Sequence, residues 1–438
     1  MRILLLTAYF PPDTGSAAHL FYELGVELVK QGHRVSVITG MPGYHAQGPL
    51  DKYRGKMWVR ENVDGMDITR VITLQLSRRL MVGRALWQFG SVVSFLVAGL
   101  GLPRHDITVV YSPPLPLGLV AWVLKRLRGT PFVLNVQDLF PQSIIDLGLL
   151  KNRLLIRLFE GMEYFVYRRA DVITVHSPGN REHVIRKMQR RSAKMDEGAK
   201  VRVIPNWVDT HFIQPGERVN DFRKEHGLGG AFVVSFAGVL GYSQDLDVVL
   251  EAARILEEDS RKSDILWLIV GDGVEKPRLE RKAREMGLAS VRFLPMQPRE
   301  RYPSVLQASD VCLTTLHAEV KTPVVPSKIL SIMAAGRPVV AALNPNGDAY
   351  RLIEEAQCGL CVPPEDPQAL AEAVMRLYHD SSLREHLGRN GRRYAEEHFS
   401  LEVCVKTYEE LFEEVISVIL KHGSGGENYA GLSKTLQG

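Results

Sequence analysis

Lys328 stands at the start of a predicted helix, where a cation is out of place. In "PSKILSIMAAGRPVVAAL", apolar residues at helical spacing over 329–333 predict a short buried helix that Ser327 caps and that Gly336 ends. A lysine in the first turn lies near the positive end of the helix dipole, which disfavours it by roughly a few tenths of a kcal/mol. Because a bound anion would reverse that penalty, we expect Lys328 and Ser327 to bind an anionic group.

Two loops of small residues follow predicted strands and precede predicted helices. Gly15 and Ser16 occur in "TAYFPPDTGSAAHL", and Gly238 and Gly241 occur in "FAGVLGYSQDLD". Small residues at such a turn let backbone N–H groups approach a phosphate or a hydroxyl closely. We assign the three glycines to a nucleotide diphosphate and Ser16 to a second substrate, with a tight structural turn as the alternative at Gly15.

Asp245 and Asp247 match the D-x-D pattern that binds a divalent cation in some nucleotide-sugar enzymes. Here the pair opens a predicted helix with an apolar face over 246–250. Aspartate is a favoured residue at a helix N-terminus, because its carboxylate accepts backbone N–H hydrogen bonds. We therefore expect helix capping and no metal site.

Asp138 follows a predicted strand in "PFVLNVQDLFPQS". A carboxylate at the carboxyl end of a strand can accept or orient the proton of a substrate hydroxyl, and capping of the next helix is the alternative. His19, His45 and His176 fall in similar loops, although a lone histidine is more often a packed polar residue. We assign Asp138, His19 and His45, with Ser16, to the second substrate.

Strand-like runs alternate with amphipathic helical patterns along the chain. The first series includes "RILLLT", "RVSVIT", "ITVVYS" and "VITVHS", and a second series starts at "FVVSFAG" after a polar linker. This pattern predicts an α/β protein with two doubly wound, Rossmann-like parallel-sheet domains that face a central cleft. The predicted parts are a first domain over 1–210, a second over 211–396, a helix over 397–421 that packs back toward the first domain, and a flexible tail over 422–438.

The composition is that of a globular protein with complete cores. The chain has 438 residues, of which 45% are hydrophobic and four are cysteines. It opens on a strand-like run without the features of a signal peptide, and four cysteines are too few for a disulfide framework. We expect a cytoplasmic location.

Charge is distributed unevenly along the chain. Residues 1–208 hold 28 Lys and Arg against 16 Asp and Glu, a net charge of +12, so the remainder holds 26 against 34, a net charge of −8. A basic half favours a polyanionic neighbour, or else is simply a solvated face. Because aromatic and basic residues do not interleave as in nucleic-acid-binding segments, we predict an anionic membrane surface and no nucleic acid.

Residues 85–102 carry no charge and are flanked by arginines. The run is barely long enough to span a bilayer, and its glycines and serines lower its hydrophobicity. A buried core helix, or a helix that lies in the membrane interface, fits better than a transmembrane helix.

Six stretches occur in order along the chain: "YFPPDTGSAA", "GHRVSVITGMPGYHAQG", "VQDLFPQS", "ITVHSPGNR", "IPNWVD" and "PSKILSIMAAGRPVV". Together they resemble the motifs of glycosyltransferase family 4, and the resemblance extends from Met1 to about Leu420. In particular, the chain resembles the bacterial transferases of O-antigen and colanic-acid assembly, including those assigned to fucosamine. The resemblance implies a GT-B fold, a UDP- or GDP-type sugar donor on the second domain, an acceptor on the first, and metal-independent transfer with retention at the anomeric carbon.

The resemblance gives Lys328 a role as a ligand of the donor diphosphate, whose departure develops negative charge. The arginine and lysine that the family usually places beside the diphosphate read as Val239 and Gln244 here. Lys328 and Lys321 are then the candidate cations.

Two glutamates usual in the family are also missing, because Pro323 and Ser331 occupy their positions. Ser331, Asp348 or Glu319 would have to replace the ribose contact of the second glutamate. On the acceptor side Gln137 replaces a histidine common among relatives, which leaves Asp138 as the titratable group.

We therefore expect a retaining glycosyltransferase that adds a hexosyl or N-acetylhexosaminyl group to a lipid-linked saccharide or polysaccharide precursor, peripheral to the cytoplasmic face of the membrane. The alternatives are a nucleotide-sugar-binding subunit without turnover, and an epimerase or phosphorylase on the same fold. A nicotinamide oxidoreductase is disfavoured, because no complete G-x-G-x-x-G is followed by an acidic residue about 20 residues later.

Overall fold

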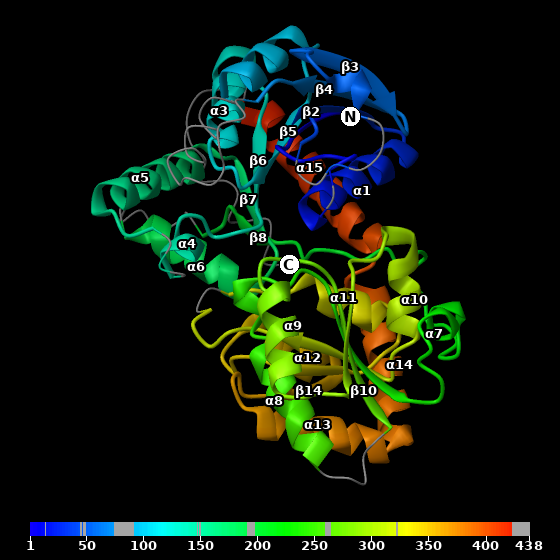
Figure 1. Cartoon of the computed structure of the whole chain (residues 1–438). Helices are drawn as coiled ribbons and strands as arrows, with labels where there is room; N and C mark the ends of the chain where they lie inside the picture. Colours follow the sequence, from blue (N-terminus) through cyan, green and yellow to red (C-terminus); the bar gives the residue numbers. More distant parts are fainter. Residues whose placement is uncertain are drawn as a thin grey trace. The chain divides into compact units, whose positions relative to one another are not determined.

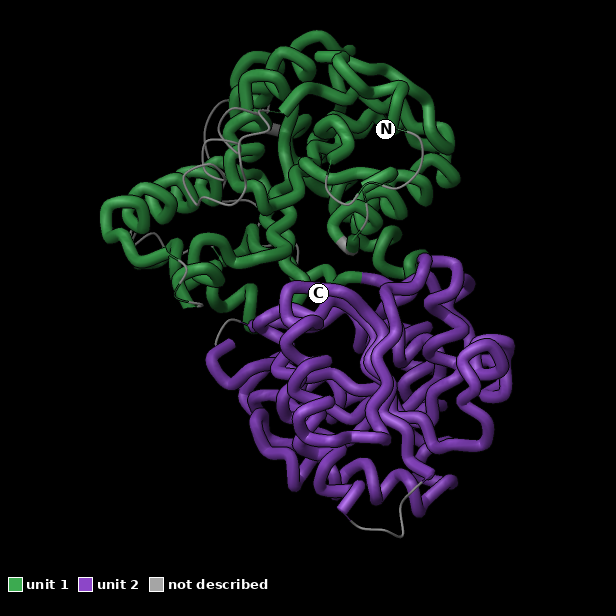
Figure 2. The backbone as a smooth tube through the Cα atoms, viewed as in Figure 1, with its two compact units in different colours: residues 1–206, 401–438 green, residues 207–400 purple. Residues whose placement is uncertain are grey.

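The computed structural model describes residues 1–438 except 14, 44–45, 47–49, 74–91, 147, 149, 191–197, 259–263, 321–322 and 423–438. The chain divides into two compact units (Figure 2). Unit 1 comprises Met1–Asn206 and Leu401–Gly438, and unit 2 comprises Trp207–Ser400. The first boundary thus lies a few residues before the predicted one.

Unit 1 contains an eight-stranded sheet in the order β3-β4-β2-β1-β5-β6-β7-β8, parallel except where β3 pairs with β4 (Figure 1). Central strands such as β5 and β6 are buried along their whole length, which explains their continuous apolar sequences. The strands are β1 (Arg2–Leu6), β2 (Arg34–Gly40), β3 (Trp58–Val63), β4 (Met66–Val71), β5 (Ile107–Ser112), β6 (Phe132–Val136), β7 (Val172–Val175) and β8 (Val201–Val203). The described helices are α1 (Ser16–Lys30), residues 92–101, α3 (Leu117–Arg128), α4 (Gln142–Asp146), α5 (Arg153–Arg169), α6 (Pro178–Gln189) and α15 (Leu401–His422).

Unit 2 contains a six-stranded parallel sheet in the order β11-β10-β9-β12-β13-β14. The predicted α/β fold with two parallel, Rossmann-like sheets is therefore confirmed. The strands are β9 (Phe232–Ala237), β10 (Ile265–Val270), β11 (Val291–Leu294), β12 (Val311–Thr315), β13 (Val339–Ala342) and β14 (Gly359–Val362). The helices are α7 (Asp221–Glu225), α8 (Asp247–Glu258), α9 (Lys276–Glu285), α10 (Tyr302–Gln307), α11 (Ser327–Ala334), α12 (Asp348–Ala356), α13 (Pro367–His379) and α14 (Ser381–His398).

Helix α15 packs against α1 within unit 1. Its buried side chains recur at intervals of three or four residues, as expected of a helix with one apolar face. Polar contacts add to this packing, because Glu409 lies 2.7 Å from the ring of His33 and the Tyr408 hydroxyl reaches into the unit to meet Asn135. The C-terminal helix thus completes the core of the N-terminal unit.

The uncharged segment predicted over 85–102 is described from residue 92 onward. Residues 92–101 form a helix in which Phe95 and Ala98 are buried in the core of unit 1, as expected of a core helix. Among the helices of the described residues, none is long and apolar enough to span a bilayer.

Candidate active site

The carboxyl edge of the unit 2 sheet has a topological switch point between β9 and β12. From β9 the chain continues to β10 and β11 on one side, whereas β12 leads to β13 and β14 on the other. Loops that leave adjacent strands in opposite directions open a crevice at this edge, where α/β proteins bind their ligands. The loop after β9 and the helix α11 both belong to this edge.

Two glycine loops pack backbone against backbone beside the switch point. Gly238 after β9 and Gly273 after β10 have φ angles of 152° and 158°, which side chains rarely adopt. A Cβ atom at Gly273 would lie 2.2 Å from the carbonyl oxygen of Leu240, and one at Gly271 would lie 1.9 Å from that of Gly238. The two loops therefore approach each other only because glycine occupies these positions. The "GDG" after the strand "ILWLIV" was the sequence signal for this second loop.

Lys328 lies in the first turn of α11 and projects toward the loop after β9. Its amine lies 3.7 Å from the centre of the Phe236 ring and donates a hydrogen bond to the side-chain oxygen of Gln244. Among the described residues no carboxylate pairs with it. The residue is half-buried, and the protein atoms around the amine lower the pKa of Lys328 to about 7. The site thus contains a cation without a counterion.

Gln244 is fixed by the short turn that carries it, η2 (Tyr242–Gln244). The hydroxyl of Thr315, at the end of β12, donates to the backbone carbonyl of Gln244, and the N–H of His317 donates to that of Ser243 at 3.0 Å. The turn therefore bridges the two strands of the switch point. The resemblance described above implied a lysine at position 244, where this chain has Gln244. The side chain of Gln244 instead orients Lys328 through a hydrogen bond that the sequence did not predict.

The D-x-D pair has structural partners. Asp247 binds Arg278 and Lys282, each at 2.9 Å, and the hydrogen bond from Arg278 is the main reason that the pKa of Asp247 falls to about 2. Asp245 accepts the backbone N–H of Val248, as expected of a capping residue, and burial raises its pKa. Within the described part of the chain no group of three metal-ligating side chains occurs.

Exposed apolar side chains gather on the loops at this edge. Val239 and Tyr242 follow β9, Val274 follows β10 and Met296 follows β11, and all four are exposed. Loops with such side chains offer flat contacts for a planar ring, and they lie beside the glycine loops. Composition alone did not single them out, because each is an ordinary loop residue.

Three other residues predicted to bind the donor are Ser327, Ser331 and Asp348, and the last two already have side-chain partners. Ser327 does not cap α11: the N-cap is Pro326, and Ser327 is already the first helical residue, so that prediction is wrong. Ser331 hydrogen-bonds with the hydroxyl of Tyr302. Asp348 is buried at the start of α12, with its carboxylate 3.8 Å from Arg351.

Two further candidates follow β12. Glu319 is exposed, and its N–H lies 3.4 Å from the ring of His317. Lys321 lies outside the described residues, and Gly241 begins the η2 turn.

Asp138 follows β6 at the carboxyl edge of the unit 1 sheet. More than a third of its surface is accessible, yet the protein atoms around its carboxylate raise the pKa of Asp138 above its usual value. Among the described groups none donates to that carboxylate, and α4 begins only at Gln142, so the residue does not cap this helix. Burial, and secondarily the charge of Asp138, raises the pKa of the nearby Tyr111.

An amide network lies beside Asp138. Gln137 and Asn206 exchange two hydrogen bonds of 2.8 Å, and Gln137 also donates to Asn135 at 2.9 Å. Asn135 in turn donates to Tyr408 at 2.7 Å and to Thr174 at 3.1 Å. Gln137, in the place of the family's histidine, is therefore held in one position.

The other predicted residues of unit 1 lie on or near α1. Gly15 precedes the helix with a φ of 114° and is exposed, and Ser16 is the first helical residue. His19 is half-buried on α1, and His45 lies outside the described residues.

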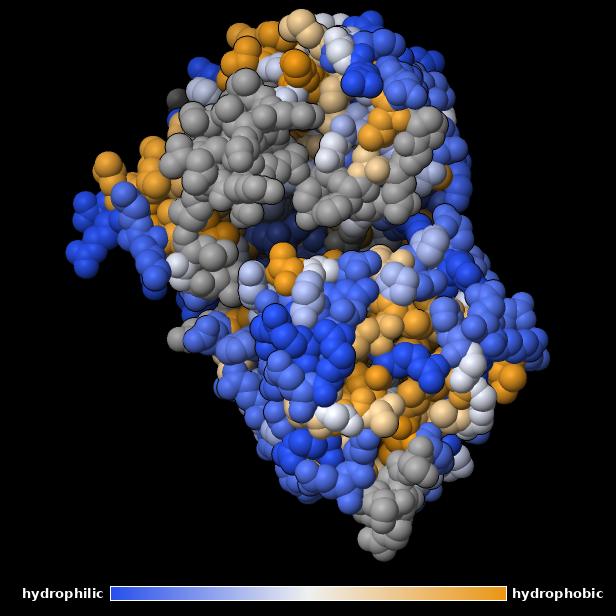
Figure 3. Space-filling view, in the orientation of Figure 1, coloured by the Kyte–Doolittle hydropathy of each residue, from blue (hydrophilic) through white to orange (hydrophobic). Residues whose placement is uncertain are grey.

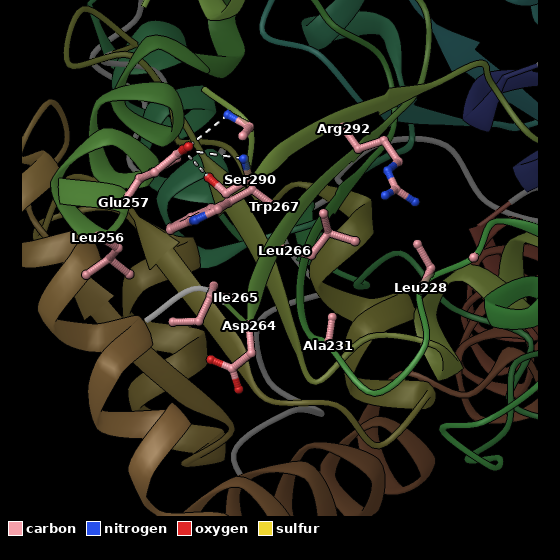
Figure 4. A pocket seen from close by; sticks show the side chains of 13 residues that line it. Leu228, Ala231, Leu256, Glu257, Asp264, Ile265, Leu266, Trp267, Ser290 and Arg292 are labelled. Carbon is pink, nitrogen blue, oxygen red and sulfur yellow. Dashed lines mark hydrogen bonds between the residues drawn. The ribbon is translucent and has the colours of Figure 1, made fainter. Parts of the chain in front are cut away.

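A described pocket lies at the opposite edge of the unit 2 sheet (Figure 4). This cavity of about 310 Å³ is lined by the start of β10 and by residues just before β9 and β11, such as Asp264, Ala231 and Ser290. Its carboxylate Glu257 already accepts hydrogen bonds from Ala289 and Ser290. It therefore lies away from the strand ends where this fold binds ligands.

The sequence matches two family models that together cover most of the chain. Residues 14–207 match the glycosyl transferase 4-like domain, and residues 219–394 match glycosyl transferases group 1. The chain belongs to glycosyltransferase family 4. Its units are those of the GT-B fold.

Two relatives and one solved structure resemble this transferase over most of its length. WcaI of Escherichia coli (strain K12), a glycosyl transferase assigned provisionally to colanic acid biosynthesis, is 26% identical and aligns over 89% of this chain and 96% of its own. O-antigen chain mannosyltransferase C of Escherichia coli is 24% identical over 95% of this chain and 99% of its own. HepE of Anabaena in complex with UDP superposes with a TM-score of 0.70 at 18% identity, over 94% of this chain and all of that chain.

Proposed function

We propose that this transferase moves a sugar from a nucleotide-diphosphate donor to a lipid-linked or polysaccharide-precursor acceptor in bacterial cell-surface glycan synthesis, with retention and without a metal. The observation that carries the proposal is Lys328, an amine at the switch point of the unit 2 sheet with which no described carboxylate pairs. The UDP bound by HepE and the glycans named for WcaI and the mannosyltransferase support the donor and acceptor classes.

Lys328 would act on the leaving group. Burial keeps part of the lysine population neutral near pH 7, and a bound diphosphate favours the charged form because opposite charges attract at short range. As the bond from the sugar to the diphosphate breaks, negative charge grows on the phosphate, and a fixed cation lowers the barrier. The exposed apolar loops after β9, β10 and β11 would contact the base.

Asp138 would act on the acceptor. Its carboxylate would accept a hydrogen bond from a sugar hydroxyl and so orient it for attack, and burial raises the pKa of this carboxyl. In this proposal the attacking hydroxyl approaches the face of the sugar that the diphosphate leaves, and a phosphate oxygen takes its proton. We place the reaction at the cytoplasmic face of the membrane, with the enzyme bound peripherally.

Thermal unfolding with UDP, GDP and ADP, with and without a chelator, tests the donor class. A nucleotide at a hundred times its Kd should stabilise the fold by about 2.7 kcal/mol. Stabilisation by one nucleotide, unchanged by chelator and lost in Lys328→Met, is expected. No stabilisation by any nucleotide would contradict the proposal.

A binding subunit without turnover is the second candidate, because Pro323 and Ser331 replace two glutamates and the Ser331 hydroxyl is engaged by Tyr302. The two functions differ in donor hydrolysis. Release of nucleoside diphosphate from a stabilising donor, above the level of Lys328→Met, excludes the binding subunit.

A further inference from the structure

Helix α5 carries leucines and arginines on the same outward face. Leu154 and Leu158 lie one turn apart and expose 75% and 57% of their surfaces. Arg153 and Arg157, one residue before each leucine, are also exposed. Single exposed leucines are ordinary on a protein surface, but a repeated pair between cations is a pattern that calls for a partner.

The opposite face of α5 is anchored in unit 1. Phe159, Val166 and Tyr167 are buried, and Val166 packs so closely on α3 that a Cβ atom at Gly118 would lie 2.3 Å from it. The buried Glu163 pairs with Lys187 at 2.8 Å. The outward face is therefore held in a fixed orientation by the packing of the inward face.

Two further arginines, Arg168 and Arg169, are exposed at the C-terminal end of α5, while Phe165 packs against Trp122 in the core of unit 1. Arg168 lies over the ring of Tyr164 and Arg169 over that of Phe165, at 5.7 and 5.4 Å. All residues of α5 are described, and none of its exposed positions is acidic. Orange and blue atoms adjoin along this helix, at the left of unit 1 in Figure 3.

We propose that the outward face of α5 docks on an anionic membrane surface. Leu154 and Leu158 enter the boundary of the acyl chains, while Arg153 and Arg157 extend their stems and bind headgroup phosphates. Leucines between cations on a single turn suit a headgroup layer better than an acidic protein, whose surface would complement only the arginines. The inference rests on the proposed peripheral location and is independent of the transfer chemistry.

The helix of residues 92–101 offers a competing surface. Val93 and Val97 expose 66% and 57% of their surfaces, so this helix also presents apolar groups outward. However, the neighbouring cation Arg128 donates to the backbone carbonyls of Leu100 and Leu102, the latter at 2.6 Å. Among the described residues, this cation is therefore already bound to backbone carbonyls, whereas α5 exposes Arg153 and Arg157.

Flotation of the full chain with vesicles of phosphatidylcholine, with and without phosphatidylglycerol, tests the assignment. Wild type should float with anionic vesicles at low salt and be released at high salt. Arg153→Gln with Arg157→Gln should lower the partition coefficient by roughly 30-fold, because each cation near an anionic surface contributes about fivefold. Leu154→Ser with Leu158→Ser should lower it by about tenfold or more.

The matched control is Val93→Ser with Val97→Ser, which should float like wild type. If this control loses binding while the leucine variant binds normally, the membrane-binding surface is formed by residues 92–101 and not by α5. That result would overturn the proposal. Wild type that ignores anionic vesicles would overturn it as well and would leave an acidic protein as the partner of α5. Thermal stabilisation by nucleotide is also measured in every variant. A lack of stabilisation would contradict the proposed donor site and would leave the membrane-surface proposal unaffected.

Discussion

Six parallel strands follow the same order in the two sheets of this transferase, but the residues that follow those strands differ in chemistry. The carboxyl edge of unit 2 presents the amine of Lys328, stacked on Phe236 beside exposed apolar loops. The carboxyl edge of unit 1 presents a carboxylate, Asp138, beside the buried phenol of Tyr111 and a network of amides. The first edge suits a diphosphate with a planar base, and the second suits sugar hydroxyls.

The difference arises from the few residues that follow each strand. In both sheets the carboxyl ends of the parallel strands lie at one edge. The backbone therefore determines where the site lies but not which chemical groups it contains. In unit 2 the strand β9 is followed by Gly238, whose φ of 152° favours glycine and whose backbone lies beside the amine of Lys328. In unit 1 the strand β6 is followed by Gln137 and Asp138. Changing these residues should therefore alter one half of the reaction at a time.

Loss of the cation should have the largest effect. Lys328→Met is expected to lower kcat by about 100- to 1,000-fold, because a preorganised donor to the leaving group is removed. Nucleotide affinity should fall in the same variant. The measurement is steady-state transfer or donor hydrolysis, with Lys282→Met as control, since Lys282 pairs with Asp247 and Glu251. Equal turnover of the two variants would contradict the donor assignment.

Loss of the carboxylate should affect only the acceptor half. Asp138→Asn is expected to lower kcat/KM for the acceptor by roughly 10- to 100-fold, because a neutral amide orients the attacking hydroxyl less strongly than a carboxylate. Nucleotide binding should stay at the wild-type level. Asp146→Asn serves as control, because Asp146 instead accepts a hydrogen bond from Gln142. A changed nucleotide affinity in Asp138→Asn would show that Asp138 also affects the donor site, and would contradict the assignment of donor and acceptor to different sheet edges.

A carboxylate introduced beside Lys328 should reduce the difference in charge between the two edges, because each edge would then contain an acidic group. Gln244→Glu is expected to weaken nucleotide binding by about tenfold, because the new carboxylate neutralises the cation and repels the diphosphate. Isothermal titration of the nucleotide measures this effect. Gln244→Leu is the matched control, which removes the hydrogen bond without adding charge, and the prediction is wrong if both variants bind alike.

The smallest predicted effect concerns the support of the unit 1 edge. Tyr408→Phe removes the hydroxyl that Asn135 donates to and should lower the free energy of unfolding by about 1–2 kcal/mol. As a control, Tyr378→Phe removes a partly exposed hydroxyl that donates to Asp264 in unit 2, and it should lower the free energy of unfolding by less than Tyr408→Phe does. Urea unfolding measures both, and a cost for Tyr408→Phe no greater than that of the control would contradict a supporting role.

The sequence predicted the fold well, because fully buried parallel strands read as unbroken apolar runs and glycine marks the turns after them. It also predicted α11 and the unusual position of Lys328, since both depend on local spacing. The capping role of Ser327 was wrong because Pro326 ends the extended segment one residue earlier than expected.

Contacts between distant segments could not be read from spacing. Gln244 and Lys328 are 84 residues apart, and only the fold brings the amide oxygen to the amine. The membrane prediction singled out an uncharged run, whereas α5 interleaves leucine with arginine, so its exposed face became visible only once its buried face was known. The apolar loops after β9, β10 and β11 gather for the same reason, because strand order places them together.

The affinity for the stabilising nucleotide as a function of pH tests the central claim most directly. Lys328 has a pKa of about 7 without ligand, and a bound diphosphate should raise it, so binding above that pH requires uptake of a proton. Kd should therefore be nearly constant below about pH 7 and rise by about tenfold per unit above it. Lys328→Arg, whose guanidinium stays charged, should bind without this dependence. A flat profile in wild type, or the same slope in Lys328→Arg, would show that Lys328 is not the cation that binds the diphosphate.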